Sequence, residues 1–327
     1  MPEQDLMSAS LSRPTLRLLQ NCVENRQLQD VMPGFEPFDF RINPHPELRE
    51  FQIFQHIVEE GIHKQADITG AVSSRFYAKS LRTSDDVRQW IQRTPGKDVY
   101  VVNPWPQCSY SVYNHQERAN IVHGSTFSTK CQQVLDRAGV DLNFVHAGRQ
   151  HNGNHGMCSY WFGSKVFWES FVNDVVLPVL LLTPHELGAE LHAFLYQPIQ
   201  YYGLAAHRPG ALPFMLERSS SLYIASAFQG RAAFYPHTRE EILRACFFPF
   251  EQDLVVQFGD EIEAWDAQGQ YPADVRLFFN ALTQHSVNGW LTYTLRHPLD
   301  FDNGDPRPRL PWYRPLQERI DLALDVA

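Results

Sequence analysis

The 327-residue sequence lacks the short motifs that most directly identify an enzyme class. It has no P-loop and no G-x-G-x-x-G loop, the backbone cradles that hold phosphates in many nucleotide-binding proteins. It has no G-x-S-x-G elbow, so a lipase-type triad has no anchor. His185-Glu186 has no second histidine at the H-E-x-x-H spacing, which argues against a zinc-protease helix.

Cysteine, long apolar runs and net positive charge are also scarce. The five cysteines form no C-x-x-C pair, which favours a reducing compartment over a disulfide framework. The longest apolar run, Val175 to Leu182, is too short to cross a bilayer, and the first residues do not resemble a signal peptide. The formal charge of -9 argues against nucleic-acid binding. We therefore expect a soluble cytoplasmic protein without a transmembrane segment.

The hydrophobic pattern predicts an α/β fold. Predicted strands alternate with helices up to about residue 182, and the remainder is predicted to be mainly helical. We expect an N-terminal helical extension over residues 1–35, with one amphipathic helix at 15–31. An α/β core over 36–182 and a mainly helical region over 183–327 follow.

Polar residues follow the apolar strand in "KDVYVVNPWP". This places Asn103 and Trp105 at the carboxyl end of a strand, the edge where open α/β sheets bind ligands. A turn with a packed tryptophan is the alternative interpretation.

The segment "HAGRQHNGNHG" carries His146, His151 and His155. Their spacing matches no zinc-site pattern, so we predict a surface loop that is mobile without ligand and holds no structural zinc. Its glycines and its arginine would suit closure over phosphates.

Two further groups of charged residues have alternative interpretations. Glu217 and Arg218 lie in an otherwise apolar helical segment, where they form either a structural ion pair or the floor of a cleft. Arg75 and Lys79, in "SSRFYAKS", are either solvated or face a diphosphate.

Four segments, taken in order, resemble a family of bacterial GT-A-like glycosyltransferases of polysaccharide assembly. They span roughly residues 38 to 230 and read "NPHPELREFQIFQHIVEEG", "GAVSSRFYAKS" followed by "DVYVVNPWP", "CSYWFGSKVFWESF", and "FMLERSSSLYIA". The resemblance implies a GT-A-like mixed sheet flanked by helices. It also implies transfer of a sugar from a nucleotide-diphosphate donor to a glycan, lipid-linked or protein acceptor. The implied location is the cytoplasm, with peripheral attachment at the inner membrane face as the alternative.

The resemblance also suggests roles for individual residues. Glu217 or Glu117 would accept the acceptor proton, and Tyr160, Trp161 and Lys165 would line the acceptor side. Phe167, Trp168 and Phe171 would form the core beneath. The full set of substrate-binding candidates comprises Arg75, Lys79, Asn103, Trp105, Asn114, Tyr160, Trp161, Lys165 and Arg218.

The sequence departs from the family pattern at the metal site. Many GT-A enzymes hold Mn²⁺ or Mg²⁺ with an Asp-x-Asp after a strand, but here the strand ends in Val-Val-Asn-Pro, and Asp300-Phe301-Asp302 lies in a Pro-rich tail. Metal dependence is therefore open. A non-catalytic binding or scaffold protein with the same fold is the alternative function. A metal-dependent hydrolase that uses the histidine loop is a third. We further predict that residues 74–79, 103–117, 158–165 and 217–218 converge on one cleft.

Overall fold

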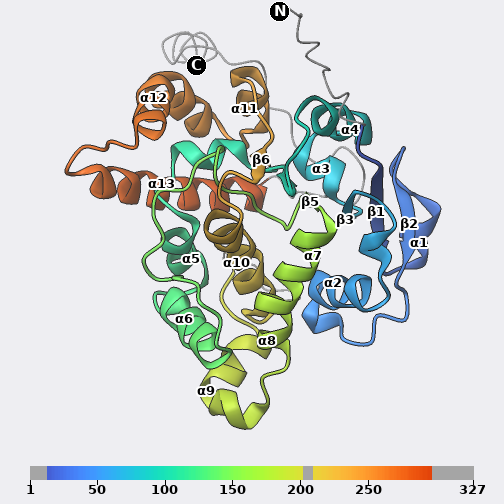
Figure 1. Ribbon diagram of the computed structural model, residues 1–327. Coiled ribbons are helices and arrows are strands. Elements are labelled where there is room, and N and C mark those ends of the chain that lie inside the picture. Colours follow the sequence, from blue (N-terminus) through green and yellow to red (C-terminus); the bar gives the residue numbers. More distant parts are fainter. Residues whose placement is uncertain (1–12, 202–208, 297–327) are drawn as a thin grey trace, which may run out of the picture.

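A six-stranded mixed sheet organises the protein (Figure 1). The computed structural model describes residues 13–201 and 209–296. The strand order is β2-β1-β3-β5-β4-β6; β5 is antiparallel to both neighbours, and all other pairs are parallel. The predicted mixed α/β fold is confirmed. The strands are β1 (Leu16–Cys22), β2 (Glu36–Asp39), β3 (Ile68–Ser73), β4 (Val99–Val101), β5 (Trp161–Gly163) and β6 (Ala232–Phe234).

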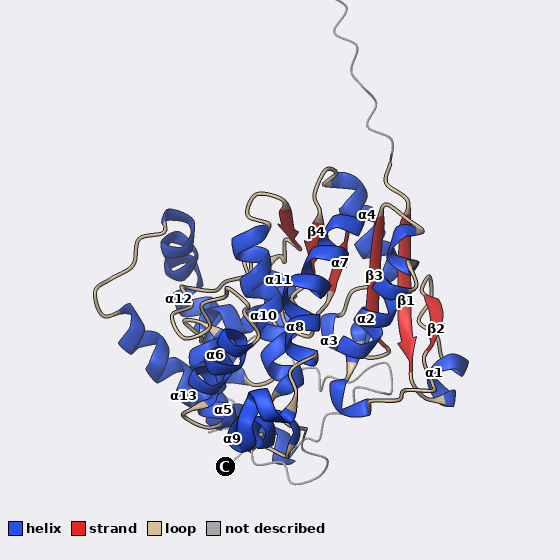
Figure 2. Ribbon diagram, turned by 60° about the horizontal axis from the view of Figure 1, so that its bottom comes forward, coloured by secondary structure: helices blue, strands red, loops and turns tan. Residues whose placement is uncertain are grey.

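Helices cover both faces of this sheet and extend beyond one end of it. In chain order they are α1 (Asn25–Gln29), η1 (Pro46–Leu48), α2 (Glu50–Glu59), η2 (Ile62–Lys64), α3 (Phe76–Ser80), α4 (Ser84–Arg93), η3 (Pro106–Tyr110), α5 (His115–His123), α6 (Phe127–Arg137), α7 (Lys165–Phe171), the π-helical turn η4 (Val172–Val176), α8 (Leu177–Leu180), α9 (Pro184–Tyr196), α10 (Leu212–Ala227), α11 (Arg239–Ala245), α12 (Pro249–Gln268) and α13 (Val275–Arg296). Figure 2 shows α5, α6, α12 and α13 gathered on the side away from β1 and β2.

The two faces of the sheet bury separate hydrophobic cores. Successive side chains of a strand point to opposite faces, so Leu18 and Val72 enter one core while Leu19 and Ala71 enter the other. Helices α2, α7 and α10 pack into the core that contains Leu19, and α4 packs into the core that contains Leu18. The sheet is therefore the middle of three layers.

A glycine allows β3 and β5 to approach closely. Gly70 pairs with Phe162, and a Cβ atom at residue 70 would lie 2.1 Å from the Phe162 ring. The aromatic ring occupies the space that a side chain on β3 would need.

The prediction of a helix over residues 15–31 is wrong. Residues Leu16–Cys22 form β1, which lies inside the sheet between β2 and β3. Residues Leu18 to Cys22 are buried on both faces, and only a strand inside the sheet accounts for that burial. A helix follows only as α1, after residue 24.

The sheet also extends past residue 182, where we expected the α/β core to end. Strand β6 comes from the region predicted to be mainly helical and pairs with β4. The boundaries drawn at residues 35 and 182 therefore do not coincide with the ends of the sheet. The last part of the region predicted to be mainly helical, residues 297–327, lies outside the described residues.

Candidate functional site

One edge of the sheet collects the ends of the strands that carry polar side chains. β1, β3, β4 and β6 are parallel, so their carboxyl ends meet there, together with the start of antiparallel β5. At this edge the hydroxyls of Ser73 and Tyr160 share a hydrogen bond of 3.0 Å. In open α/β sheets this is the edge at which ligands bind.

A group of charged and polar side chains lies at this edge, and we call it the Lys79 cluster. Its members come from α2, α3, α10, the turn before β5 and the segment after α9. They are Glu50, Lys79, Cys158, Tyr160, Tyr201 and Glu217. Three of the four segments predicted to converge therefore meet here: those with Lys79, with Cys158 and Tyr160, and with Glu217.

Lys79 is the cation of this cluster. Its Nζ lies 3.6 Å from the Sγ of Cys158. Burial acts to lower the pKa of Lys79, but acidic groups around it raise the pKa above its ordinary value; they include Cys158, Tyr160, Tyr201 and Glu217. The ammonium therefore stays charged at neutral pH and can bind an anion.

Glu50, like Tyr201, belongs to the cluster but was not suggested by the sequence. It begins α2, directly after Arg49, whose φ of 53° is unusual for a residue other than glycine. Burial, and to a smaller extent the charge of Glu217, raises the pKa of Glu50 to about 7. A carboxyl group with this pKa can accept or donate a proton at neutral pH.

A pocket of about 540 Å³ lies beside α3, and we call it the α3 pocket. Tyr77 and Ala78 of α3 line it, whereas Lys79 belongs to the charged cluster. Its remaining lining residues are Arg26, Gln27, Asp30, Met32, Pro33, Phe35, Ser74, Arg82, Thr83 and Ser84. Its volume and its mixture of apolar walls with a few polar groups are typical of small-molecule sites.

Gln20 of β1 shapes one wall of the α3 pocket. Its side chain is wholly buried and donates to the carbonyls of Gln27 (3.0 Å) and Asp30 (3.2 Å). Its amide oxygen accepts from the Met32 backbone N–H at 2.8 Å. A glutamine inside a buried strand must find hydrogen-bond partners, so Gln20 would have indicated a bonded loop beside it if β1 had been recognised as a strand.

Other predicted site residues lie in several places. Trp161 is 2% exposed and packs in the core against Phe54, Phe167 and Trp168, whereas Lys165 is exposed at the start of α7. Neither belongs to the Lys79 cluster. Arg75 is exposed at the N-terminal end of α3.

The predicted residues between 103 and 117 are held by local contacts. The Asn103 amide donates a hydrogen bond to the Asn152 side chain, and the Trp105 indole donates one to the sulfur of Cys158. Asn114 accepts from the backbone N–H of Glu117 and so caps α5. The Glu117 carboxylate lies 3.2 Å from Arg276 of α13. Within this segment, Trp105 makes a direct contact with the Lys79 cluster.

Arg218 is buried beside Glu217 but has different neighbours. Its guanidinium donates to the backbone carbonyls of His115 and Phe214.

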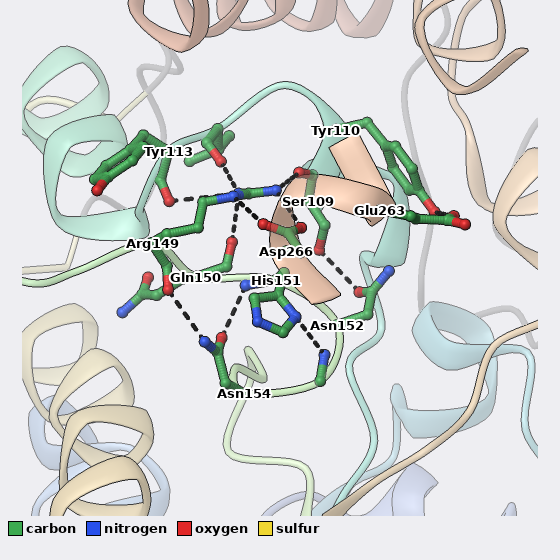
Figure 3. A network of polar contacts seen from close by, with 12 residues as sticks. Ser109, Tyr110, Tyr113, Arg149, Gln150, His151, Asn152, Asn154, Glu263 and Asp266 are labelled. Carbon is green, nitrogen blue, oxygen red and sulfur yellow. Dashed lines mark hydrogen bonds and ion pairs between the residues drawn. The ribbon is translucent and has the colours of Figure 1, made fainter. Parts of the chain in front are cut away.

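The segment 146–156 is not the exposed surface loop that we predicted. Arg149, Gln150 and His155 are buried, and Arg149 alone donates to several backbone carbonyls (Figure 3). The His155 ring stacks on His115, with centroids 4.2 Å apart. Burial lowers the pKa of His155 to about 3, with a smaller effect of the Arg218 charge. Among residues 13–201 and 209–296, no three His, Cys, Asp or Glu side chains are placed to hold a metal ion.

No single helix in the described part of the chain is long and apolar enough to cross a membrane. Two consecutive segments, Lys165–Leu180 and Pro184–Tyr196, are long and apolar enough only when taken together, and the chain bends by 90° between them.

Comparisons of the chain with protein-family models, with curated proteins and with solved structures found no match. The function is therefore inferred from the α3 pocket and the Lys79 cluster.

Proposed function

We propose that the protein is a glycosyltransferase that moves a sugar from a nucleotide-diphosphate donor to an acceptor hydroxyl. The observation that carries this proposal is the position of α3. This helix contributes Tyr77 and Ala78 to a pocket of nucleoside size and Lys79 to the charged cluster beside it. A donor that contains a nucleoside and a diphosphate needs these two environments next to each other.

The charges of the cluster suit both the leaving diphosphate and the attacking acceptor hydroxyl. The Lys79 ammonium stabilises the leaving diphosphate, whose charge grows as the glycosidic bond breaks. A carboxylate removes the proton of the acceptor hydroxyl, and Glu217 is the residue that we assign to this step. Glu50 is the nearby carboxyl group whose proton can be gained or lost at neutral pH.

The residues at the cluster do not fit a tightly held Mn²⁺ or Mg²⁺ ion. These cations take about six oxygen ligands, with carboxylates prominent among them. Here Glu50 and Glu217 share their surroundings with the ammonium of Lys79, which would repel a divalent cation. We therefore derive no step through a metal.

Binding and turnover measured together test the proposal. Purified protein is titrated with UDP, GDP and their sugar conjugates by calorimetry, with and without Mn²⁺. The sugar conjugates that bind are then incubated with the protein and with glycan and lipid-linked acceptors. We expect binding, and release of the nucleoside diphosphate that depends on the acceptor. Binding without release would favour the non-catalytic alternative, and no binding by any nucleotide would overturn the proposal.

A further inference from the structure

Residues 103–113 follow β4, and we call them the β4 edge segment. Hydrogen bonds from a second loop, which contains Arg149 and Asn152, hold this segment in place. Arg149 of that loop donates to the carbonyls of Ser109 at 2.6 Å and Val112 at 2.5 Å. It also reaches the Tyr113 carbonyl at 3.4 Å. One side chain therefore fixes three backbone groups of a segment that is neither strand nor α-helix along most of its length (Figure 3).

The same guanidinium is tied to the C-terminal helices. Its Nε and its second terminal nitrogen each lie 2.9 Å from the carboxylate of Asp266 in α12, and both side chains are nearly buried. The guanidinium carbon also lies 4.4 Å from the centre of the Phe279 ring in α13. A bidentate pair between a guanidinium and a carboxylate fixes the orientation of the two groups as well as the distance between them.

Asn152, three residues further along, fixes the part of the segment nearest the sheet. Its amide oxygen accepts from Asn103 at 3.0 Å and from the Ser109 hydroxyl at 2.9 Å. Its amide nitrogen donates to the Pro106 carbonyl at 3.0 Å. All the hydrogen-bonding directions used at Asn152 therefore point into the β4 edge segment.

These contacts lead to the Lys79 cluster. The Asn103 side chain accepts from the backbone N–H of Trp105 at 3.2 Å, which orients the turn that bears the indole. The indole N–H of Trp105 donates a hydrogen bond to the sulfur of Cys158, and that sulfur lies 3.6 Å from the Nζ of Lys79. A change at Asn152 would thus reach the cluster through Asn103 and Trp105.

We propose that Arg149 and Asn152 are positioning residues that set the β4 edge segment, and through Trp105 the Lys79 cluster, for catalysis. This inference rests on the proposed function for its kinetic part. Neither residue lines the α3 pocket. Their loss is therefore expected to lower turnover more than it weakens the affinity for the nucleotide.

Hydrogen–deuterium exchange tests the structural part without any assay of activity. Asn152→Ala and Arg149→Lys are compared with the unaltered protein. A lysine at position 149 keeps the positive charge but cannot form a bidentate pair with Asp266. Exchange is expected to rise in peptides that cover residues 103–113 and to stay unchanged in those that cover 68–82. Equal exchange in 103–113 for Asn152→Ala would overturn the inference, even if Arg149→Lys fails to fold.

Kinetics test the functional part. We expect kcat to fall about tenfold to a hundredfold in Asn152→Ala, the range for a small misplacement of a catalytic group, with a smaller change in KM for the donor. Arg231→Lys is the matched control, because the Arg231–Asp98 pair, 2.7 Å apart, lies at the opposite end of β4. A rise in KM with unchanged kcat would overturn the positioning role. If the unaltered protein transfers no sugar, the proposed function fails, while the exchange result still decides the structural part.

Discussion

The ammonium of Lys79 and the thiol of Cys158 lie 3.6 Å apart, joining α3 to the turn before β5. Cys158 and Ser159 both have positive φ values, 63° and 52°, in that turn. Such backbone conformations are costly for residues other than glycine, and they cluster at functional sites. The strained turn presents the thiol to the lysine at the edge of the sheet where we place the diphosphate.

Replacing Lys79 with alanine is expected to weaken nucleotide binding by about tenfold or more, because a charge-assisted contact to phosphate is lost. Calorimetry with the nucleoside diphosphate measures the change. Lys64→Ala serves as the control, since Lys64 is exposed and paired with Glu169 at 2.9 Å. Equal affinities for Lys79→Ala and the unaltered protein would contradict the assignment of the diphosphate to Lys79.

Replacing Glu217 with glutamine is expected to reduce turnover by about two orders of magnitude or more, the range for loss of a general base. The fold should persist, because glutamine has nearly the same shape and α10 is packed by its apolar residues. Initial rates at saturating donor measure the effect, and thermal unfolding checks the fold. Normal turnover would leave Glu217 a structural role only.

The pH dependence of turnover should report Glu50. Its pKa of about 7 means that the carboxyl group is protonated below neutral pH and ionised above it. We expect an inflection near pH 7 in the profile of kcat/KM for the unaltered protein, and none at that pH in Glu50→Gln. Retention of the inflection in Glu50→Gln would assign it to another group.

Acidification should destabilise the protein below neutral pH. In the unfolded chain His123 and His155 bind protons at about pH 6.5, whereas burial lowers the pKa of each in the folded protein to about 3. The unfolded state therefore holds more protons between these values, and the free energy of unfolding falls as the pH drops from 6.5 towards 3. The slope is at most about 1.4 kcal/mol per pH unit for each histidine.

Urea unfolding between pH 7.5 and 5 measures this loss. His155→Phe keeps a ring to stack on His115 and removes one titrating group, so its slope should be shallower. His45→Gln, at an exposed position, is the control. Identical slopes for His155→Phe and the unaltered protein would contradict the prediction.

Gly70→Ala should destabilise the fold by about 1–3 kcal/mol, the usual range for overpacking. The added Cβ would lie 2.1 Å from the Phe162 ring and would force β3 and β5 apart. At Gly148 a Cβ meets no atom within 4 Å, so Gly148→Ala is the matched control. Equal unfolding midpoints for the two variants would show that the sheet can absorb the methyl group.

Strong local signals made part of the fold predictable. Threonine is a favoured N-cap residue, and Thr83 lies directly before α4, where its side chain accepts from the Asp86 backbone N–H. The β-branched residues before Asn103 likewise predict β4. β1 was missed because Leu16–Cys22 runs without a turn residue into the polar residues of α1, which suits a helical interpretation as well. Its burial on both faces depends on β2 and β3, which local periodicity does not show.

The candidate site was predictable only in part, for a related reason. Lys79, Tyr160 and Glu217 belong to motifs that the sequence displays, and the structure brings them together. Glu50 follows a Pro-rich segment and looks like an ordinary helix start, and its raised pKa arises from packing against distant residues. The loop around Arg149 has the composition of a surface loop, but α12, more than a hundred residues later, buries it.

Strand β6 gives the order of synthesis a physical consequence. β4 leaves the ribosome long before Ala232–Phe234, so one side of β4 has no partner until most of the chain has been made. An unpaired strand edge is a template for joining another chain. Nascent chains that stall before Ala232 should therefore be especially prone to associate with one another.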